Sequence, residues 1–221
     1  MGTLTGAVVR GVGRPGPVYG GDVRRRYAPD VDRWAPLEVA GVRKLIVGSA
    51  AWLSGGVALD VWLGHKSRVH GDIDVSIRHL DWPRFAEILP SWLHPYAAQG
   101  GWLTPSEEIA GAEALENIWC LDRRSGNWCL QINLESGDED QWIYRRFSAI
   151  TLPWDKAVLN VEGMRIVAPE VQLLWKSKDP ELKDEEDRKR IVPLLDARAR
   201  RWLGDAIALA HPKSTWNARA Q

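Results

Sequence analysis

The stretch WLSGGVALDVWLGHKSRVHGDIDVSI, residues 52–77, decides the fold. The apolar run that ends at Ser54 predicts a short buried strand, and the two glycines that follow turn the chain. Residues 57–63 have the spacing of a short helix, which Gly64 ends. Residues 72–78 then alternate between polar and apolar side chains, as a half-buried strand does. The stretch therefore predicts two strands joined by a glycine turn and a helix.

Two acidic residues, Asp72 and Asp74, begin the second of these strands. Residues i and i+2 of a strand share one face, roughly 7 Å apart. Two carboxylates on a rigid strand suit Mg²⁺, which also accepts oxygens from substrate phosphates. The Gly55-Gly56 turn lets backbone N–H groups approach a triphosphate at a helix N-terminus. The combination predicts a magnesium–nucleotide site, whereas the Asp pair alone also fits two solvated acids.

Three motifs in this stretch carry a family resemblance: G-G-x-A-x-D at 55–60, L-G at 63–64 and R-x-H-x-D-I-D at 68–74. They resemble the core of the aminoglycoside 2''-adenylyltransferase group. That group is related to the lincosamide nucleotidyltransferases and belongs to the polymerase-β-type nucleotidyltransferases. APEVQLLWKSK at 168–178, KDEED at 183–187 and VPLL at 192–195 are similar to the helical C-terminal part of the group. The resemblance extends over about residues 34–216.

The resemblance implies an α+β fold. Its core would be a polymerase-β-type mixed sheet with flanking helices over residues 34–150. Residues 151–221 would form a mainly helical portion that completes the site. Residues 1–33, rich in Gly, Pro and Arg, are expected to form an N-terminal arm.

The implied reaction is Mg²⁺-dependent transfer of AMP from ATP, or NMP from another NTP, to a hydroxyl of a small molecule, with release of pyrophosphate. An aminoglycoside-like antibiotic is the acceptor that the named relatives suggest, so the implied role is antibiotic resistance. Asp72 and Asp74 would hold two Mg²⁺ ions, and Ser54, Gly55 and Gly56 would contact the phosphates of ATP.

Four further side chains are candidates for nucleotide binding, and each has a structural alternative. Arg68 contacts phosphate or forms an ion pair with Asp60. His70 is a ligand or a structural imidazole. Lys176 and Lys178 reach the triphosphate or are solvated at a helix end.

The third carboxylate that these enzymes usually carry on a neighbouring strand is missing from its expected place. The strand predicted over 128–135 has Gln131 and Asn133 there. Glu135 shares their face and is the candidate general base and third metal ligand. The alternatives are an exposed acid before a turn and, for the whole chain, a catalytically weak nucleotide-binding or partner-binding module of toxin–antitoxin or regulatory type.

The charge balance disfavours nucleic acid and membrane surfaces as partners. Lys and Arg number 29, as do Asp and Glu, so the net charge is zero. The basic run at 24–26 keeps transfer to RNA open. Residues 45–64 are apolar, but their glycines and Asp60 argue against a membrane span. Cys120 and Cys129 do not make a disulfide framework, which favours reduced thiols in a cytoplasmic protein.

The remaining periodicities complete the expected layout. Helices are predicted over 36–47, 82–89, 170–178, 181–195 and 197–210, and strands over 118–122, 128–135, 142–147 and 164–167. Residues 90–115 have no clear period and are expected to be irregular. Asp81 is the expected cap of the helix over 82–89, and the charge run within 181–195 is interpreted as a solvated helix face. The G-x-G-x-x-G pattern at 11–16 contains prolines that forbid a dinucleotide-binding helix.

Overall fold

A computed structural model of the chain describes residues 24–108 and 115–217. It confirms the α+β fold: one mixed sheet has the strand order β1-β5-β4-β6-β7-β3-β2-β11-β10, and β8 and β9 extend it from β7. The strands are β1 (Arg25–Arg26), β2 (Trp52–Ser54), β3 (Asp74–Arg78), β4 (Leu93–Gln99), β5 (Trp102–Pro105), β6 (Asn117–Asp122), β7 (Asn127–Gly137), β8 (Gln141–Ile143), β9 (Thr151–Pro153), β10 (Val158–Val161) and β11 (Met164–Val167). The helices are α1 (Val39–Ile46), α2 (Gly55–Leu63), α3 (Trp82–Ile88), α4 (Trp154–Ala157), α5 (Pro169–Lys176), α6 (Leu182–Ile191) and α7 (Ala197–Ala210).

The centre of the sheet is formed by β2, β3 and β7. β2 pairs antiparallel with β3 and places Ser54 opposite Asp74, whereas β7 pairs parallel with β3 and places Gln131 opposite Asp74. Val75 and Ile77 of β3 are fully buried in the core. The strand predicted from residue 72 begins at Asp74, so Asp72 precedes it.

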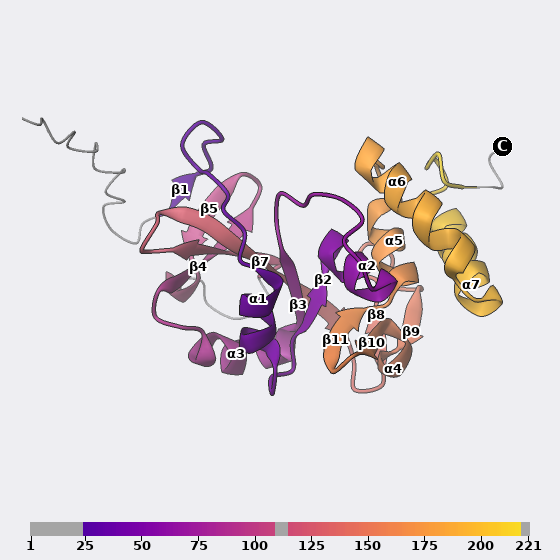
Figure 1. The fold of residues 1–221 in the computed structure, drawn as a ribbon, viewed down its shortest axis with the longest axis horizontal. Helices are drawn as coiled ribbons and strands as arrows, with labels where there is room; N and C mark the ends of the chain where they lie inside the picture. The colour runs from indigo at the N-terminus through magenta and orange to yellow at the C-terminus, as the bar shows by residue number, and fades with distance from the viewer. Residues whose placement is uncertain (1–23, 109–114, 218–221) are drawn as a thin grey trace, which may run out of the picture.

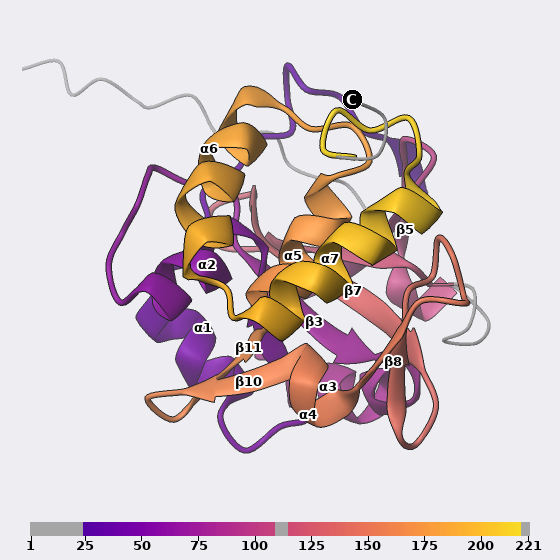
Figure 2. The same ribbon diagram turned by 90° about the vertical axis from the view of Figure 1, so that its right-hand side faces the viewer.

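The C-terminal helices gather at one end of the molecule. In Figure 1, α5, α6 and α7 lie at the end away from β1, β4 and β5, and in Figure 2 they lie in front of the sheet. α5 packs against α2, α6 and α7. The helix that follows the glycine turn is therefore held by the C-terminal helices.

The boundary expected at residue 150, between the core and the mainly helical C-terminal portion, does not coincide with an edge of the sheet. β11 pairs parallel with β2, with Ile166 opposite Leu53, and β10 pairs with β11. The portion expected to be mainly helical thus begins by adding strands beside the strand that leads to Gly55.

Residues 90–115, expected to be irregular, contain β4 and β5. Buried residues do not strictly alternate along β4, and Pro95 lies within it, so no period-2 signal marks this strand. Asp81 does not cap α3 through its side chain; it accepts a hydrogen bond from Arg78 Nε at 2.6 Å. The helix expected over 181–195 ends at Ile191, and a 3₁₀ turn over 192–194, which contains Pro193, follows it.

The described part of the N-terminal arm is anchored to the sheet. β1 pairs with β5, and the buried Asp32 accepts hydrogen bonds from Arg25 Nη1 at 2.8 Å and Trp128 Nε1 at 3.0 Å. The glycine pattern at 11–16 lies outside the described residues. Cys120 and Cys129 are buried, free thiols. Over 24–108 and 115–217, no helix has the length and apolar character needed to cross a membrane.

Candidate active site

The turn between β2 and α2 requires glycine at both of its positions. Gly55 has a φ of +71°, and a side chain there would overlap the carboxylate of Asp74. A side chain at Gly56 would overlap the guanidinium of Arg68 and the ring of His70. The Gly55 N–H donates to Gln172 Oε1 of α5 at 2.8 Å. The turn is thus fixed against β3 and against a C-terminal helix.

The Asp72–Asp74 pair combines an exposed carboxylate with a largely desolvated one. Burial and the nearby charge of Asp72 raise the pKa of Asp74 to about 7. No basic side chain of the described residues lies within ion-pair distance of Asp74, whose hydrogen bond comes from Asn133 Nδ2 at 3.4 Å. Two crowded carboxylates with hard oxygens fit a divalent cation, because its charge would relieve their repulsion.

Glu135 lies in the same pocket as Asp74 and is hydrogen-bonded to other side chains. It pairs in register with Arg78, four residues along β7 from Gln131. Its oxygens accept hydrogen bonds from Ser76 Oγ at 3.2 Å and Trp142 Nε1 at 2.9 Å, and burial raises its pKa. Glu135 is therefore not the exposed acid of the alternative interpretation. In the described part of the chain, no three acidic, histidine or cysteine side chains are gathered as a metal site, so the role of Glu135 as a third metal ligand stays a prediction.

Arg68 and His70 are held by carboxylates that lie outside the Asp pair. His70 Nε2 is 2.7 Å from Asp60 Oδ2, as the structural alternative expected. Arg68 does not pair with Asp60: its Nε and Nη2 both donate to Asp187 of α6, each at 3.1 Å. The two side chains therefore join the loop before β3 to α2 and α6.

Lys176 belongs to the same buried network. Its Nζ is 2.5 Å from Asp184 Oδ1 and 3.1 Å from Asp187 Oδ2. Asp184 and Asp187 are buried, so this part of the charge run is not the solvated face that was expected. Lys178 is more than half exposed, and its Nζ is 3.9 Å from Asp179.

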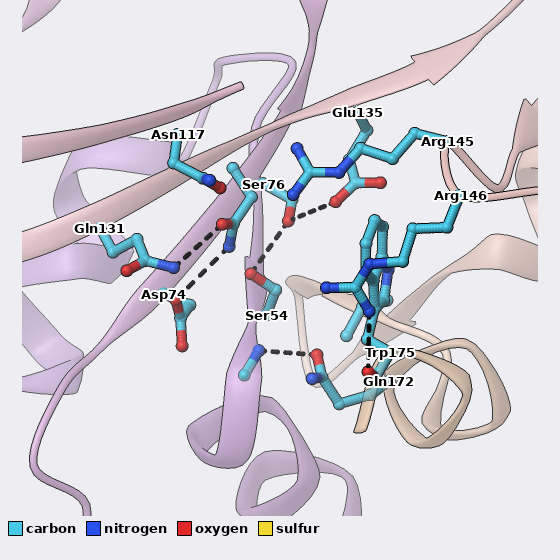
Figure 3. A pocket seen from close by; sticks show the side chains of 13 residues that line it. Ser54, Asp74, Ser76, Asn117, Gln131, Glu135, Arg145, Arg146, Gln172 and Trp175 are labelled. Atoms are coloured by element: carbon cyan, nitrogen blue, oxygen red, sulfur yellow. Dashed lines mark hydrogen bonds between the residues drawn. The ribbon is translucent and has the colours of Figure 1, made fainter. Parts of the chain in front are cut away.

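The pocket beside the glycine turn has a volume of about 310 Å³. Figure 3 shows its polar lining, contributed by β2, β3, β6, β7, the chain after β8, and α5. Its lining residues are Ser54, Gly55, Asp74, Ser76, Asn117, Gln131, Asn133, Glu135, Arg145, Arg146, Val167, Gln172 and Trp175. Asp72 instead lines a second cavity of about 530 Å³ between α1, α2 and the β10–β11 hairpin.

Arg145 and Arg146 are pocket residues that the sequence did not reveal. Their guanidinium carbons lie 4.9 Å and 4.8 Å from the ring centroid of Trp175. They belong to the segment between β8 and β9, which was expected to continue a strand as far as residue 147. An Arg-Arg dipeptide by itself has no signal of a site; only the fold brings it to the glycine turn.

Comparison with known proteins supports an enzymatic interpretation. The family model described as aminoglycoside-2''-adenylyltransferase matches residues 44–120. The match includes the glycine turn and the Asp72–Asp74 pair and ends before β7. No curated protein matches the chain significantly.

Three solved structures are similar to the chain. The lincomycin-bound lincosamide antibiotic adenylyltransferase LnuA is 18% identical, with a TM-score of 0.43, over 63% of this chain and 83% of that chain. The Megavirus polyadenylate synthase is 12% identical, with a TM-score of 0.37, over 77% of this chain and 30% of that chain. JHP933 from Helicobacter pylori is 14% identical, with a TM-score of 0.31, over 82% of this chain and 92% of that chain.

All three TM-scores are below 0.5, so the assignment rests on the family match and on the residues within it. Enzymes of this kind use a nucleoside triphosphate and a divalent metal. The resemblance found in the sequence is confirmed over residues 44–120, where the chain is similar to the aminoglycoside-2''-adenylyltransferases, and this match supports a nucleotidyltransferase enzyme.

Proposed function

We propose that this nucleotidyltransferase uses Mg²⁺ and ATP to transfer AMP to a hydroxyl of a small molecule, with release of pyrophosphate. The first acceptors to test are aminoglycoside-like antibiotics, because the family model that matches the chain is named for them. The observation that carries the proposal is the close approach of Gly55 to the carboxylate of Asp74. It supports a site in which a helix N-terminus and a metal-binding acid face the same phosphates.

Asp72 and Asp74 are the proposed holders of Mg²⁺. When bound there, Mg²⁺ would neutralise charge on the phosphates and make the acceptor hydroxyl easier to deprotonate. Asn133, which donates to Asp74, would keep that carboxylate oriented.

The proposed phosphate contacts come from Ser54 and Gly56. The Gly55 N–H is already bound to Gln172, so it orients the turn rather than the nucleotide. Ser54 Oγ lies 2.9 Å from Ser76 Oγ, and the hydrogen bond between the two hydroxyls holds Ser54 beside the turn. The N-terminus of α2 would add a favourable dipole.

Glu135 is the proposed general base. It and Asp74 are the acids among the described residues that line the pocket. Burial strengthens it as a base by raising its pKa towards the working pH. It would accept the proton of the acceptor hydroxyl while the new oxygen–phosphorus bond forms and the bond to pyrophosphate breaks.

Pyrophosphate release in the presence of ATP, Mg²⁺ and a panel of hydroxyl-bearing antibiotics tests the reaction. Mass spectrometry of the acceptor should show one added AMP. If ATP binds but no acceptor in a broad panel stimulates release, the antibiotic part of the proposal is wrong.

One observation favours a second candidate, a catalytically weak nucleotide-binding or partner-binding module. An amide, Gln131, stands opposite Asp74, and a second amide, Asn133, contacts Asp74. In such a module ATP would bind with Mg²⁺, and Glu135→Gln would change neither binding nor turnover.

A further inference from the structure

Most of the basic residues that the family resemblance assigned to the triphosphate form ion pairs with acidic side chains. Arg68 and Lys176 share the buried Asp187, and Lys176 also pairs with Asp184. Moving Lys176 to a phosphate would leave the buried Asp184 without its cation, and moving Arg68 would remove two hydrogen bonds from the buried Asp187, so either change is costly. Lys178 does not line the pocket. Lys183 lies close enough to Asp72 for their charges to interact, but its Nζ is 3.2 Å from Glu181.

Arg145 and Arg146 are different, because they face the pocket without an ion pair at contact distance among the described residues; the charge of Arg145 acts on Glu135 only from a longer range. No acid of the described residues lies within ion-pair distance of either guanidinium. Arg145 Nη1 donates to the carbonyl of Glu116 at 3.4 Å, and Arg146 Nη1 donates to the carbonyl of Trp175 at 3.2 Å and to Tyr144 Oη at 3.4 Å. Each guanidinium has five N–H donors, so most of them remain available.

The two guanidiniums are also close to the glycine turn. They contact the ring of Trp175, which lies three residues after Gln172 on α5, and Gln172 binds the Gly55 N–H. Three helical residues advance roughly 4.5 Å along the axis. Figure 3 shows both arginines reaching in from the side of the pocket opposite Asp74 and Gln131. An anion bound at the turn would therefore lie between Asp74 and the two arginines.

We propose that Arg145 and Arg146 bind the β- and γ-phosphates of the nucleotide, in place of Arg68, Lys176 and Lys178. Stacking on Trp175 holds both side chains in place, so little rotamer freedom is lost when a phosphate binds. Planar guanidiniums also match phosphate oxygens better than ammonium groups do. This inference rests on the proposed function, because it assumes that a triphosphate binds beside Gly55.

The test compares Arg145→Gln, Arg146→Gln and the double variant with the wild type. Arg124→Gln is the matched control: Arg124 also stacks on a tryptophan, 3.8 Å from the Trp92 centroid, but it lies outside the pocket. Arg145→Lys and Arg146→Lys test whether charge alone suffices. Thermal unfolding establishes that each variant is folded.

Calorimetric titrations with a non-hydrolysable ATP analogue and with AMP, both with Mg²⁺, give the readout. Each Gln variant should weaken binding of the analogue about tenfold and the double variant about a hundredfold. AMP affinity should change much less, since AMP lacks the β- and γ-phosphates. The Lys variants should recover part of the loss, and Arg124→Gln should bind like the wild type.

Other outcomes overturn the inference, and they separate it from the proposed function. Wild-type affinity for the analogue in the double variant, or an equal loss for the analogue and AMP, rules out these phosphate contacts. An unchanged analogue affinity with a raised KM for the acceptor assigns the arginines to the acceptor instead. If the folded wild type binds no nucleotide, the proposed function fails together with the inference.

Discussion

Gly55, the residue after β2, lies so close to the carboxylate of Asp74 on β3 that position 55 has no room for a side chain. The positive φ of Gly55 and the Asp74 carboxylate belong to one arrangement, in which the start of α2 is pressed against an acid on the neighbouring strand. The glycine thus brings the N-terminus of α2 to the carboxylate that we propose as a metal ligand.

Gly55→Ala should therefore disrupt both stability and nucleotide binding. The backbone penalty at positive φ alone is about 1–2 kcal/mol, and the overlap with Asp74 adds to it. Gly41→Ala is the control, because a Cβ at Gly41 in α1 meets no atom within 4 Å. It should stabilise the protein by about 0.5–1 kcal/mol. Urea unfolding measures both changes, and equal effects of the two substitutions would contradict the account.

The raised pKa of Asp74 gives stability a defined pH dependence without metal. The folded state holds the proton up to a pKa of about 7, whereas the unfolded chain loses it near its usual value of about 4. Stability should therefore fall as pH rises from about 4 to about 7 and level off above that range. Asp74→Asn should remove this contribution and be the more stable protein at pH 8, by up to roughly 4 kcal/mol.

Mg²⁺ provides the internal check on this prediction. It should restore stability to the wild type at pH 8 but not to Asp74→Asn, because the metal binds the ionised carboxylate. Urea unfolding at pH 5 and pH 8, in EDTA or Mg²⁺, measures all four conditions. An identical pH profile for wild type and variant would contradict the assigned pKa.

Asp187→Asn should be strongly destabilising. Asp187 is buried and accepts contacts from both Arg68 and Lys176, so its loss leaves Arg68 without its ion pair and Lys176 with Asp184 alone. A cost of about 3–5 kcal/mol is expected. Glu186→Gln, which removes the exposed ion pair with Arg190, should cost less than about 1 kcal/mol. Chemical unfolding measures both changes. If Asp187→Asn lost no more unfolding free energy than Glu186→Gln, the ion-pair network would not stabilise the fold.

Glu135→Gln should separate binding from turnover. The amide keeps the shape of the side chain but cannot accept a proton, so turnover should fall by roughly 10²–10⁴. Affinity for the ATP analogue should stay within about threefold of the wild type, a difference of about 0.7 kcal/mol. Pyrophosphate release and calorimetry measure the two effects, and an unchanged rate would favour a different base.

The parts of the site that could be predicted are those that depend on short-range sequence patterns. The Gly55-Gly56 turn, the helix ended by Gly64 and the strand after Asp72 each follow from short-range patterns. Asp72 and Asp74 could be singled out because their spacing is itself the signal.

The parts that could not be predicted depend on contacts between distant segments. Asp187 meets Arg68 across 119 positions of sequence, so nothing near either residue distinguishes it from a solvated helical acid. Arg145 and Arg146 reach the pocket only because α5 brings Trp175 beneath them. Strand β4 escaped prediction because its burial does not alternate.

Calorimetric titration with a non-hydrolysable ATP analogue, with and without Mg²⁺, tests the central claim most directly. The wild type is compared with the Asp72→Asn/Asp74→Asn double variant, both shown to be folded. The account predicts that Mg²⁺ strengthens binding to the wild type and that the double variant loses this dependence. No binding by the folded wild type, or the same Mg²⁺ dependence in both proteins, would contradict it.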